Sequence, residues 1–185
     1  MLAFIKNLFG KSVEYELFTG NQRELEREKM YELQNKSSNE IWIVAGELDH
    51  KFYNDTFVNI IAKKLKTIPC FTVNILFSKD ERLVHEEKIK KILKENEPLC
   101  TLLKAEAFEG RFAMYLSEKR HPNHFGIVDN SILIEKIHEP RGPRDVLLVY
   151  NYKKLIEKYK RYFFKLINEP GVKKLSHNDF QTIAV

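Results

Sequence analysis

Cysteine, glycine and proline are scarce in this chain of 185 residues. With 2 Cys, 7 Gly and 6 Pro, the composition excludes a disulfide scaffold, a collagen-like fibre and low-complexity material. No apolar run approaches the roughly 20 residues that a membrane-spanning helix requires. The chain instead has 43% hydrophobic and 31% charged residues, which is typical of a folded domain, and its length suffices to bury one core.

Neither the cysteines nor the first residues indicate export. Cys70 and Cys100 each lie beside apolar residues and have no partner at metal-ligand spacing, so we expect both to be buried in a reducing compartment. Residues 1–12 have an apolar helical face, but Lys6 interrupts the run that a secretion signal needs. We expect a short amphipathic helix there, docked on the body or serving as an anchor, and a cytoplasmic protein.

Hydrophobic periodicity predicts that strands and helices alternate in the first half of the chain and that strands dominate the second. The expected strands are 13–19, 41–45, 71–77, 99–105, 112–116, 124–129, 132–137 and 146–150, and the expected helices are 21–34, 54–67, 78–95 and 152–168. This order predicts a single α/β domain over residues 13–169, with a mixed, mainly parallel sheet flanked by helices. Residues 170–185 look like a loosely held tail.

Several common catalytic motifs are missing. The chain has no G-x-x-x-x-G-K-[ST], G-x-G-x-x-G, G-x-S-x-G or H-E-x-x-H, so the sequence offers no phosphate cradle, nucleophile elbow or zinc-protease helix. Neither cysteine has the surroundings of a catalytic thiolate. We therefore expect no cofactor and no bound metal.

Reactive side chains gather between residues 120 and 144, across a predicted hairpin and its exit loop. If the strands pair, these side chains could converge at one end of the sheet, where open α/β folds bind ligands. The ordinary alternative is that they cap strand ends or lie in solvated loops. The candidates are His121, His124, Asp129, His138 and Glu139 for catalysis, and Arg120, Lys136, Arg141, Arg144 and Asn151 for ligand binding.

The same region resembles the C-terminal half of a phospholipase D-like domain. The resemblance rests on residues 124–129, on strand 132–137, and on the run 146–151 that leads into an aromatic-rich closing helix. The order of elements over 22–77 fits as well. The resemblance spans most of residues 20–167, and it implies the phospholipase D-like fold.

The catalytic motif of that family is not present. Its enzymes use H-x-K-x4-D, in which the His attacks phosphorus, the Lys binds phosphate oxygens and the Asp supports the structure. None of the six His is followed by Lys two positions later. If Asp129 takes the Asp position, Pro122 stands in place of the nucleophile and His124 in place of the Lys. No Gly-Ser/Thr-x-Asn companion is recognisable either.

A shifted site is the alternative. His121 or His124 could act as the nucleophile, with His138, Lys136 or Arg144 stabilising the phosphoryl oxygens. His121, His124 and Glu139 could also hold a metal, although positions three apart on a strand face opposite sides, which is poor ligand geometry.

The basic residues form short clusters on the predicted helices. Most clusters lie opposite apolar stripes and are explained as solvated faces. The closing helix is denser, with five cations between Lys153 and Arg161 and Tyr152 just before them. A phosphate-backbone contact there would weaken steeply with salt.

These observations favour a binding module over an enzyme. The resemblance and the missing motif together imply a non-catalytic, regulatory phospholipase D-like domain whose ligand is an anionic phosphodiester, with nucleic acid the first choice. A phosphodiesterase or nuclease with a rearranged His site is the alternative. A structural homodimer is a third reading, since single-domain members of the resembled family usually pair.

Overall fold

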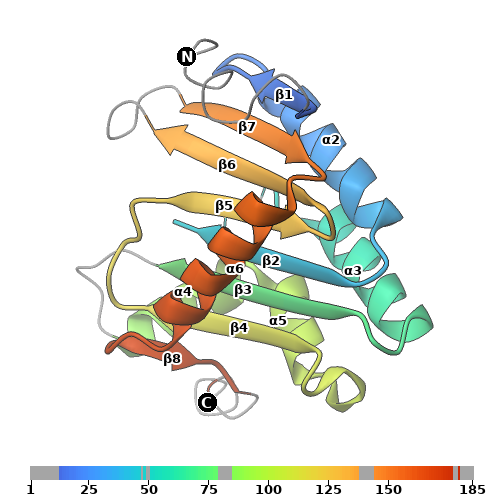
Figure 1. The fold of residues 1–185 in the computed structure, drawn as a ribbon. Coiled ribbons are helices and arrows are strands. Elements are labelled where there is room, and N and C mark those ends of the chain that lie inside the picture. Colours follow the sequence, from blue (N-terminus) through green and yellow to red (C-terminus); the bar gives the residue numbers. More distant parts are fainter. Residues whose placement is uncertain are drawn as a thin grey trace.

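An eight-stranded sheet forms the centre of the computed structural model, which describes residues 13–46, 48, 51–78, 85–137, 144–176 and 179. The strand order is β1-β7-β6-β5-β2-β3-β4-β8 (Figure 1). The strands are β1 Tyr15–Phe18, β2 Glu40–Ala45, β3 Thr72–Ser78, β4 Phe112–Ser117, β5 His124–Val128, β6 Ser131–Ile137, β7 Arg144–Tyr150 and β8 Val172–Lys174. The helix expected over 1–12 lies outside the described residues.

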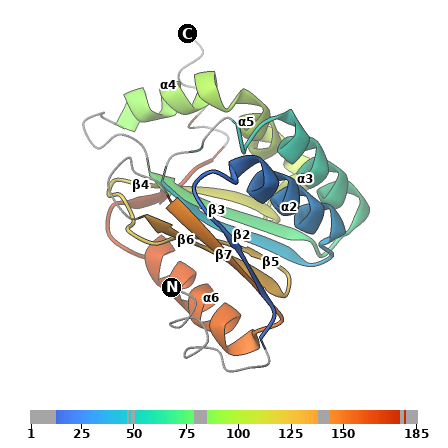
Figure 2. The ribbon, with the colours of Figure 1, turned by 90° about the horizontal axis from the view of Figure 1, so that it is seen from above.

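Helices cover the two faces of the sheet unequally. Figure 2 shows α2, α3, α4 and α5 on one face and α6 across the other. Their bounds are α2 Arg23–Lys36, α3 Asp55–Thr67, α4 His85–Glu95, α5 Glu97–Lys104 and α6 Lys153–Ile167, with a 3₁₀ turn at Glu106–Phe108. Within the described ranges, no helix is long and apolar enough to cross a membrane.

The expected mixed α/β sheet is confirmed, but the expectation that it is mainly parallel is wrong. Of the seven described strand pairings, only β2–β3 and β3–β4 are parallel. The sequence has helical crossovers between the early strands, and these produce the parallel part. The turn at Asp129–Asn130 then joins β5 and β6 as antiparallel neighbours, since a short turn can only reverse the chain. β7 pairs antiparallel with β6.

Alternating residues of the central strands build two separate cores. Ile41 and Ile43 of β2 pack with Phe57 of α3 on one face, whereas Trp42 and Val44 pack with Phe163 of α6 on the other. This period of two places successive side chains on opposite faces. The predicted run 41–45 is apolar throughout because β2 is covered on both faces.

Two predicted elements and one predicted burial are wrong. Residues 99–105, expected as a strand, lie mostly in helix α5, whose first turn holds Pro98, a favoured residue at that position. The expected loose tail instead begins with β8, which pairs with β4 and is followed by the buried Leu175. Cys100 is buried as expected, but Cys70 is exposed, because it lies in the turn between α3 and β3.

Candidate functional site

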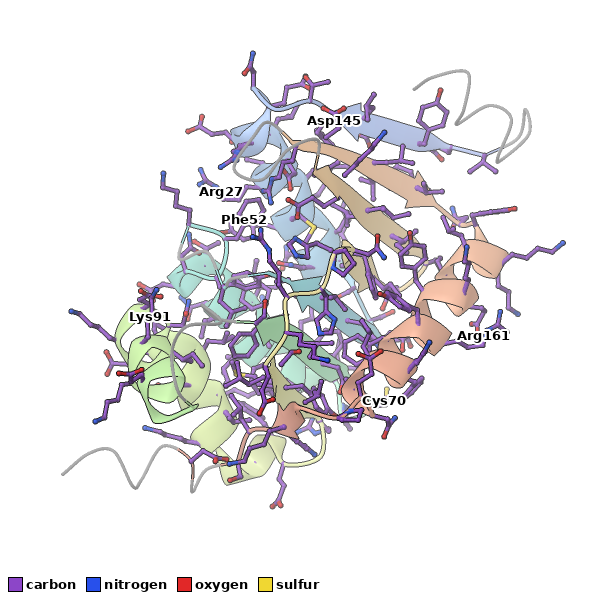
Figure 3. The ribbon with its side chains drawn as sticks, turned by 90° about the vertical axis from the view of Figure 1, so that its left-hand side faces the viewer. Arg27, Phe52, Cys70, Lys91, Asp145 and Arg161 are labelled. Atoms are coloured by element: carbon purple, nitrogen blue, oxygen red, sulfur yellow. The ribbon has the colours of Figure 1, made fainter. Side chains whose placement is uncertain are left out.

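Buried polar side chains gather at one end of the sheet, where parallel strands β2, β3 and β4 end and β5 begins. Ser78 ends β3, Ser117 ends β4, His124 opens β5 and His121 lies just before it, and all four are buried. This end is the left-hand edge of Figure 1 and faces the viewer in Figure 3. Carboxyl ends of parallel strands are where open α/β sheets bind ligands.

His124 is held by a carboxylate from the neighbouring strand. The β5–β6 hairpin pairs His124 directly with Glu135, and His124 Nδ1 lies 3.2 Å from Glu135 Oε2. Facing an ionised carboxylate, Nδ1 is the donor, and in the neutral imidazole this leaves the lone pair on Nε2. The Nε2 atom is buried and has no hydrogen-bond partner among the described residues. The carboxylate of Glu135 therefore orients the ring.

Gly46 provides the space for this imidazole. A Cβ at position 46 would lie 2.7 Å from His124 Cε1 and 3.0 Å from Nε2, closer than a real Cβ approaches. The Gly46 carbonyl accepts hydrogen bonds from the Ser78 backbone N–H, at 2.8 Å, and from the Ser78 hydroxyl, at 3.0 Å. The glycine is thus required by close approach of a side chain, and β3 fixes its position.

A chain of ion pairs continues from Glu135 into the helical layer. Arg144 Nη1 lies 2.8 Å from Glu135 Oε1, and Arg144 Nη2 lies 3.5 Å from Glu26 Oε1 of α2. The guanidinium also sits 5.5 Å from the ring centroid of Phe52, which is labelled in Figure 3. Two carboxylates thus neutralise this arginine, so it is not a free phosphate-binding cation.

The two carboxylates have opposite pKa shifts. Burial acts to raise the pKa of Glu135, but hydrogen bonds from His124 and Arg144 and their charges outweigh it, so the pKa is lowered. Burial raises the pKa of Glu26, and the attraction of Arg144 only partly opposes this. Glu135 is therefore the ionised partner of the cluster, while Glu26 is the carboxylate that takes up a proton first.

His121 is the second buried imidazole at this end. Its exposed fraction is 4%, and its Nε2 has no hydrogen-bond partner. Burial lowers the pKa of His121; the charge of Glu169 opposes this effect and that of His124 adds to it. His121 is thus held neutral. Pro122, the next residue, is exposed and has no nucleophilic atom.

Asp129 lies at the opposite end of β5 from His124, roughly 16 Å away at about 3.3 Å per residue. Its carboxylate accepts backbone hydrogen bonds from Ser38, Asn39 and Glu40, at 2.7, 3.0 and 2.9 Å. With φ at +48°, Asp129 both forms the hairpin turn and ties it to the start of β2. The structure therefore separates it from the histidines with which the sequence grouped it.

The remaining predicted residues do not join this cluster. Asn151, with φ at +54°, hydrogen-bonds Asn130 at the Asp129 end of the sheet. Arg120 and Lys136 are exposed. His138, Glu139 and Arg141 lie outside the described residues. In the part of the chain that the structure describes, no three His, Cys, Asp or Glu side chains gather in a way that could hold a metal ion.

Sequence reasoning missed Glu135 and Glu26. A signal for Glu135 was available, because a turn at Asp129–Asn130 pairs Val128 with Ser131, and that register carries His124 opposite Glu135. Glu26 had no such signal, since it is one of several glutamates on a charged helix. Only the packing of α2 on the sheet selects it.

A second polar feature lies on α6, on the other face of the sheet. Four exposed cations recur at spacings of four, three and four residues and so share one side of the helix. We call these residues the α6 stripe: Lys154, Lys158, Arg161 and Lys165. Figure 3 shows Arg161 on the outer side of α6. Among the described residues no ion pair neutralises the stripe, whereas the neighbouring Lys160 pairs with Glu40.

The net charge of the chain is concentrated around this stripe. Residues 152–176, which hold α6 and β8, contain eight Lys and Arg against two Glu, a net +6, while the whole chain carries +5. The rest of the protein is therefore close to neutral. An uncompensated field of this kind attracts polyanions and speeds their association.

Comparison with known proteins identifies the fold. No protein-family model and no curated protein sequence matches the chain. Among solved structures, it is similar to TrmBL2, an archaeal chromatin protein described with a novel mode of DNA binding, at 14% identity and a TM-score of 0.60, covering 94% of this chain. It is also similar to the phospholipase D family member Nuc from Salmonella typhimurium, at 10% identity, a TM-score of 0.58 and 89% coverage.

The chain has the phospholipase D-like fold. Phosphatidylserine synthase from Haemophilus influenzae matches too, with 14% identity, a TM-score of 0.57 and 91% of this chain covered. The alignment spans 99% of Nuc but only 59% of the TrmBL2 chain and 41% of the synthase. At these identities the likeness concerns the fold.

Proposed function

We propose that this chain is a non-catalytic, phospholipase D-like module that binds nucleic acid through the cations of α6. The observation that carries the proposal is the α6 stripe, four exposed cations on one side of a helix without ion-pair partners among the described residues. Phosphate contacts of this kind supply most of the sequence-independent affinity for nucleic acid. The DNA-binding protein among the structural neighbours supports the choice of ligand.

The state of the site end supports binding rather than turnover. If Asp129 takes the Asp position of the family motif, Pro122 stands in place of the nucleophile. His124, whose ring lies against Glu135, then stands in place of the Lys. The nearby Arg144 is engaged by two carboxylates. A phosphate entering there would meet the carboxylates of Glu135 and Glu26. The α6 stripe has one neighbouring carboxylate on its own helix, Glu157, and no ion pair between them is found among the described residues.

The test is binding of a fluorescein-labelled DNA duplex, followed by fluorescence anisotropy at several salt concentrations. Each phosphate contact contributes a slope of about −0.9 in log K against log salt. Replacing Lys154→Gln and Lys158→Gln together should reduce the magnitude of the slope by about 2. The matched control is Lys63→Gln with Lys66→Gln, two exposed lysines of α3 on the opposite layer. Equal losses in both double variants would contradict the assignment to α6.

A phosphodiesterase with a rearranged site is the second candidate, and the free Nε2 of His124 favours it. This nitrogen could attack phosphorus and displace an alcohol, after which water would hydrolyse the phosphohistidine. Metal-independent hydrolysis of bis(p-nitrophenyl) phosphate that His124→Ala abolishes would establish this function and overturn the non-catalytic one. We expect no turnover, because Arg144, which lies next to His124 through Glu135, is already engaged by two carboxylates.

A further inference from the structure

Phe164 is an aromatic ring held out in solvent on α6. Its exposed fraction is 53%, although three other aromatic residues of the same helix are partly or fully buried. The centroids of the Phe164 and Trp42 rings lie 4.9 Å apart, and the two ring planes form an angle of 85°, as in an edge-to-face contact. Phe164 also provides the carbonyl that accepts a hydrogen bond from the Asn168 side chain at 2.6 Å. Trp42 therefore packs against the Phe164 ring, which stays 53% exposed to solvent.

Cations lie close to Phe164 along α6. Arg161 of the α6 stripe lies three residues before it, at a neighbouring position on the helix surface, and Lys165 of the stripe follows it directly. On the other side, Lys160 lies 5.7 Å from the Trp42 ring centroid and pairs with Glu40. Glu157 is the acidic residue of α6, about two turns before Phe164. The outer side of α6 therefore presents the Phe164 ring next to cations that have no ion-pair partner among the described residues.

We infer that Phe164 stacks on an unpaired base and that the α6 surface prefers single-stranded nucleic acid. This inference rests on the proposed function and adds the class of ligand to it. Proteins bind single strands by combining a cationic track for the phosphates with aromatic rings on which bases stack. In a duplex the base faces are already stacked on each other, so Phe164 gains nothing there. The stripe supplies the phosphate contacts and Phe164 the strand preference.

A lipid surface fits these observations less well. A helix that lies in a membrane interface inserts a broad apolar face. The apolar side chains of α6, including Ile156, Phe163 and Leu166, are buried against the sheet instead. The half-exposed Phe164 ring remains on the outer side of α6. It offers too little apolar surface for insertion into a membrane but enough to stack on one base.

The experiment compares a fluorescein-labelled 15-nucleotide oligo-dT with a 15-base-pair duplex, by anisotropy at fixed salt. Phe164→Ala should weaken oligo-dT binding about tenfold, since one stacked base is worth that much, and change duplex binding less than twofold. Phe164→Tyr should restore the affinity. Leu25→Ala is the matched control, because Leu25 is 51% exposed on α2, in the other layer. Oligo-dT should also change the emission of Trp42, the single tryptophan of the chain.

The outcomes separate the inference from the proposed function. If the stripe variants weaken both probes and Phe164→Ala weakens neither, the inference is overturned and nucleic-acid binding stands. If the wild-type chain binds neither probe, the proposed function itself fails. Binding of anionic phosphatidylserine vesicles in place of DNA, lost in Phe164→Ala, would assign the ring to a lipid surface. A dimer by light scattering that Phe164→Ala dissociates would assign it to a second copy of the chain.

Discussion

The end of the sheet at His124 and the outer side of α6 carry charge in opposite ways. At the sheet end, Glu135, Arg144 and Glu26 are packed into consecutive ion pairs next to two buried imidazoles. On α6, the cations of the stripe face solvent without partners among the described residues. The first arrangement satisfies its own charges and supports the fold, whereas the second leaves charge available to a ligand.

Adjacent residues of β5 point toward these two regions, on opposite faces of the sheet. His124 points to the same face as Gly126, whose substituted Cβ would meet Met30 of α2, whereas Phe125 packs on Tyr159 of α6 at 4.8 Å. Because strand side chains alternate between faces, His124 lies under the helical layer with α2. The cationic helix covers the other face. The His124 cluster and the α6 stripe therefore lie on opposite faces of the sheet.

The largest effect is expected for Glu135→Ala. The substitution removes the carboxylate that pairs with the His124 ring and with Arg144 Nη1, which leaves a partly buried charge uncompensated. We therefore expect the unfolding free energy to fall by about 3 kcal/mol. Urea denaturation at pH 7 measures it. Lys136→Ala, the exposed neighbour, is the control and should change stability by less than about 0.5 kcal/mol. Similar values for both would mean that the ion pairs do not stabilise this end.

Gly46→Ala should destabilise by about 2 kcal/mol, because the new methyl group overlaps the His124 ring. Gly126→Ala is the matched control, since its nearest contact, Met30 Cε, lies at an ordinary 3.7 Å. Combining Gly46→Ala with His124→Ala should recover part of the loss, as thermal unfolding would show. If the stability losses of the two single variants simply add in the double variant, a direct clash between the new methyl group and the His124 ring is contradicted.

The sheet end should respond to pH, and α6 should not. Because burial lowers the pKa of His121, the unfolded chain takes up a proton first as pH falls below about 6.5, and stability falls with it. The raised pKa of Glu26 acts in the opposite direction. The difference between wild type and His121→Gln in denaturation at pH 7 and 5.5 isolates the histidine. Measured against wild type, the unfolding free energy of His121→Gln should be higher at pH 5.5 than at pH 7.

DNA affinity should stay flat over the same pH interval, because lysine and arginine do not titrate there. An affinity that rises steeply toward pH 5.5 in the wild type and stays flat in His121→Gln would place the sheet end in the binding surface. That result would break the separation of the two regions.

The smallest effect on stability is expected for the stripe itself. Lys154→Gln and Lys158→Gln remove exposed cations without ion-pair partners among the described residues, so each should change the unfolding free energy by less than about 0.5 kcal/mol. The same variants are expected to reduce DNA binding. A stability loss above about 1 kcal/mol would show that these lysines support the fold.

Sequence patterns predicted most elements because strand and helix periods depend on neighbouring residues. They failed at 99–105, where a short apolar run fits a buried strand and a buried helix equally. They also failed at β8, since an edge strand of three residues has too little pattern to be read. In the site, His121 and His124 were identified by their chemistry, but Asp129 was grouped with them although β5 places His124 and Asp129 at opposite ends of one strand.

The sequence alone determined the alternation of buried strands and helices, the absence of H-x-K, and the density of cations on the closing helix. These are properties of residue types and of spacing along the chain. The tertiary structure decided which charges are neutralised, because Glu26 reaches Arg144 only after α2 packs on the sheet. It also decided that Asp129 lies far from His124 and that Phe164 faces solvent. Packing and strand direction set these relations, and neither is encoded locally.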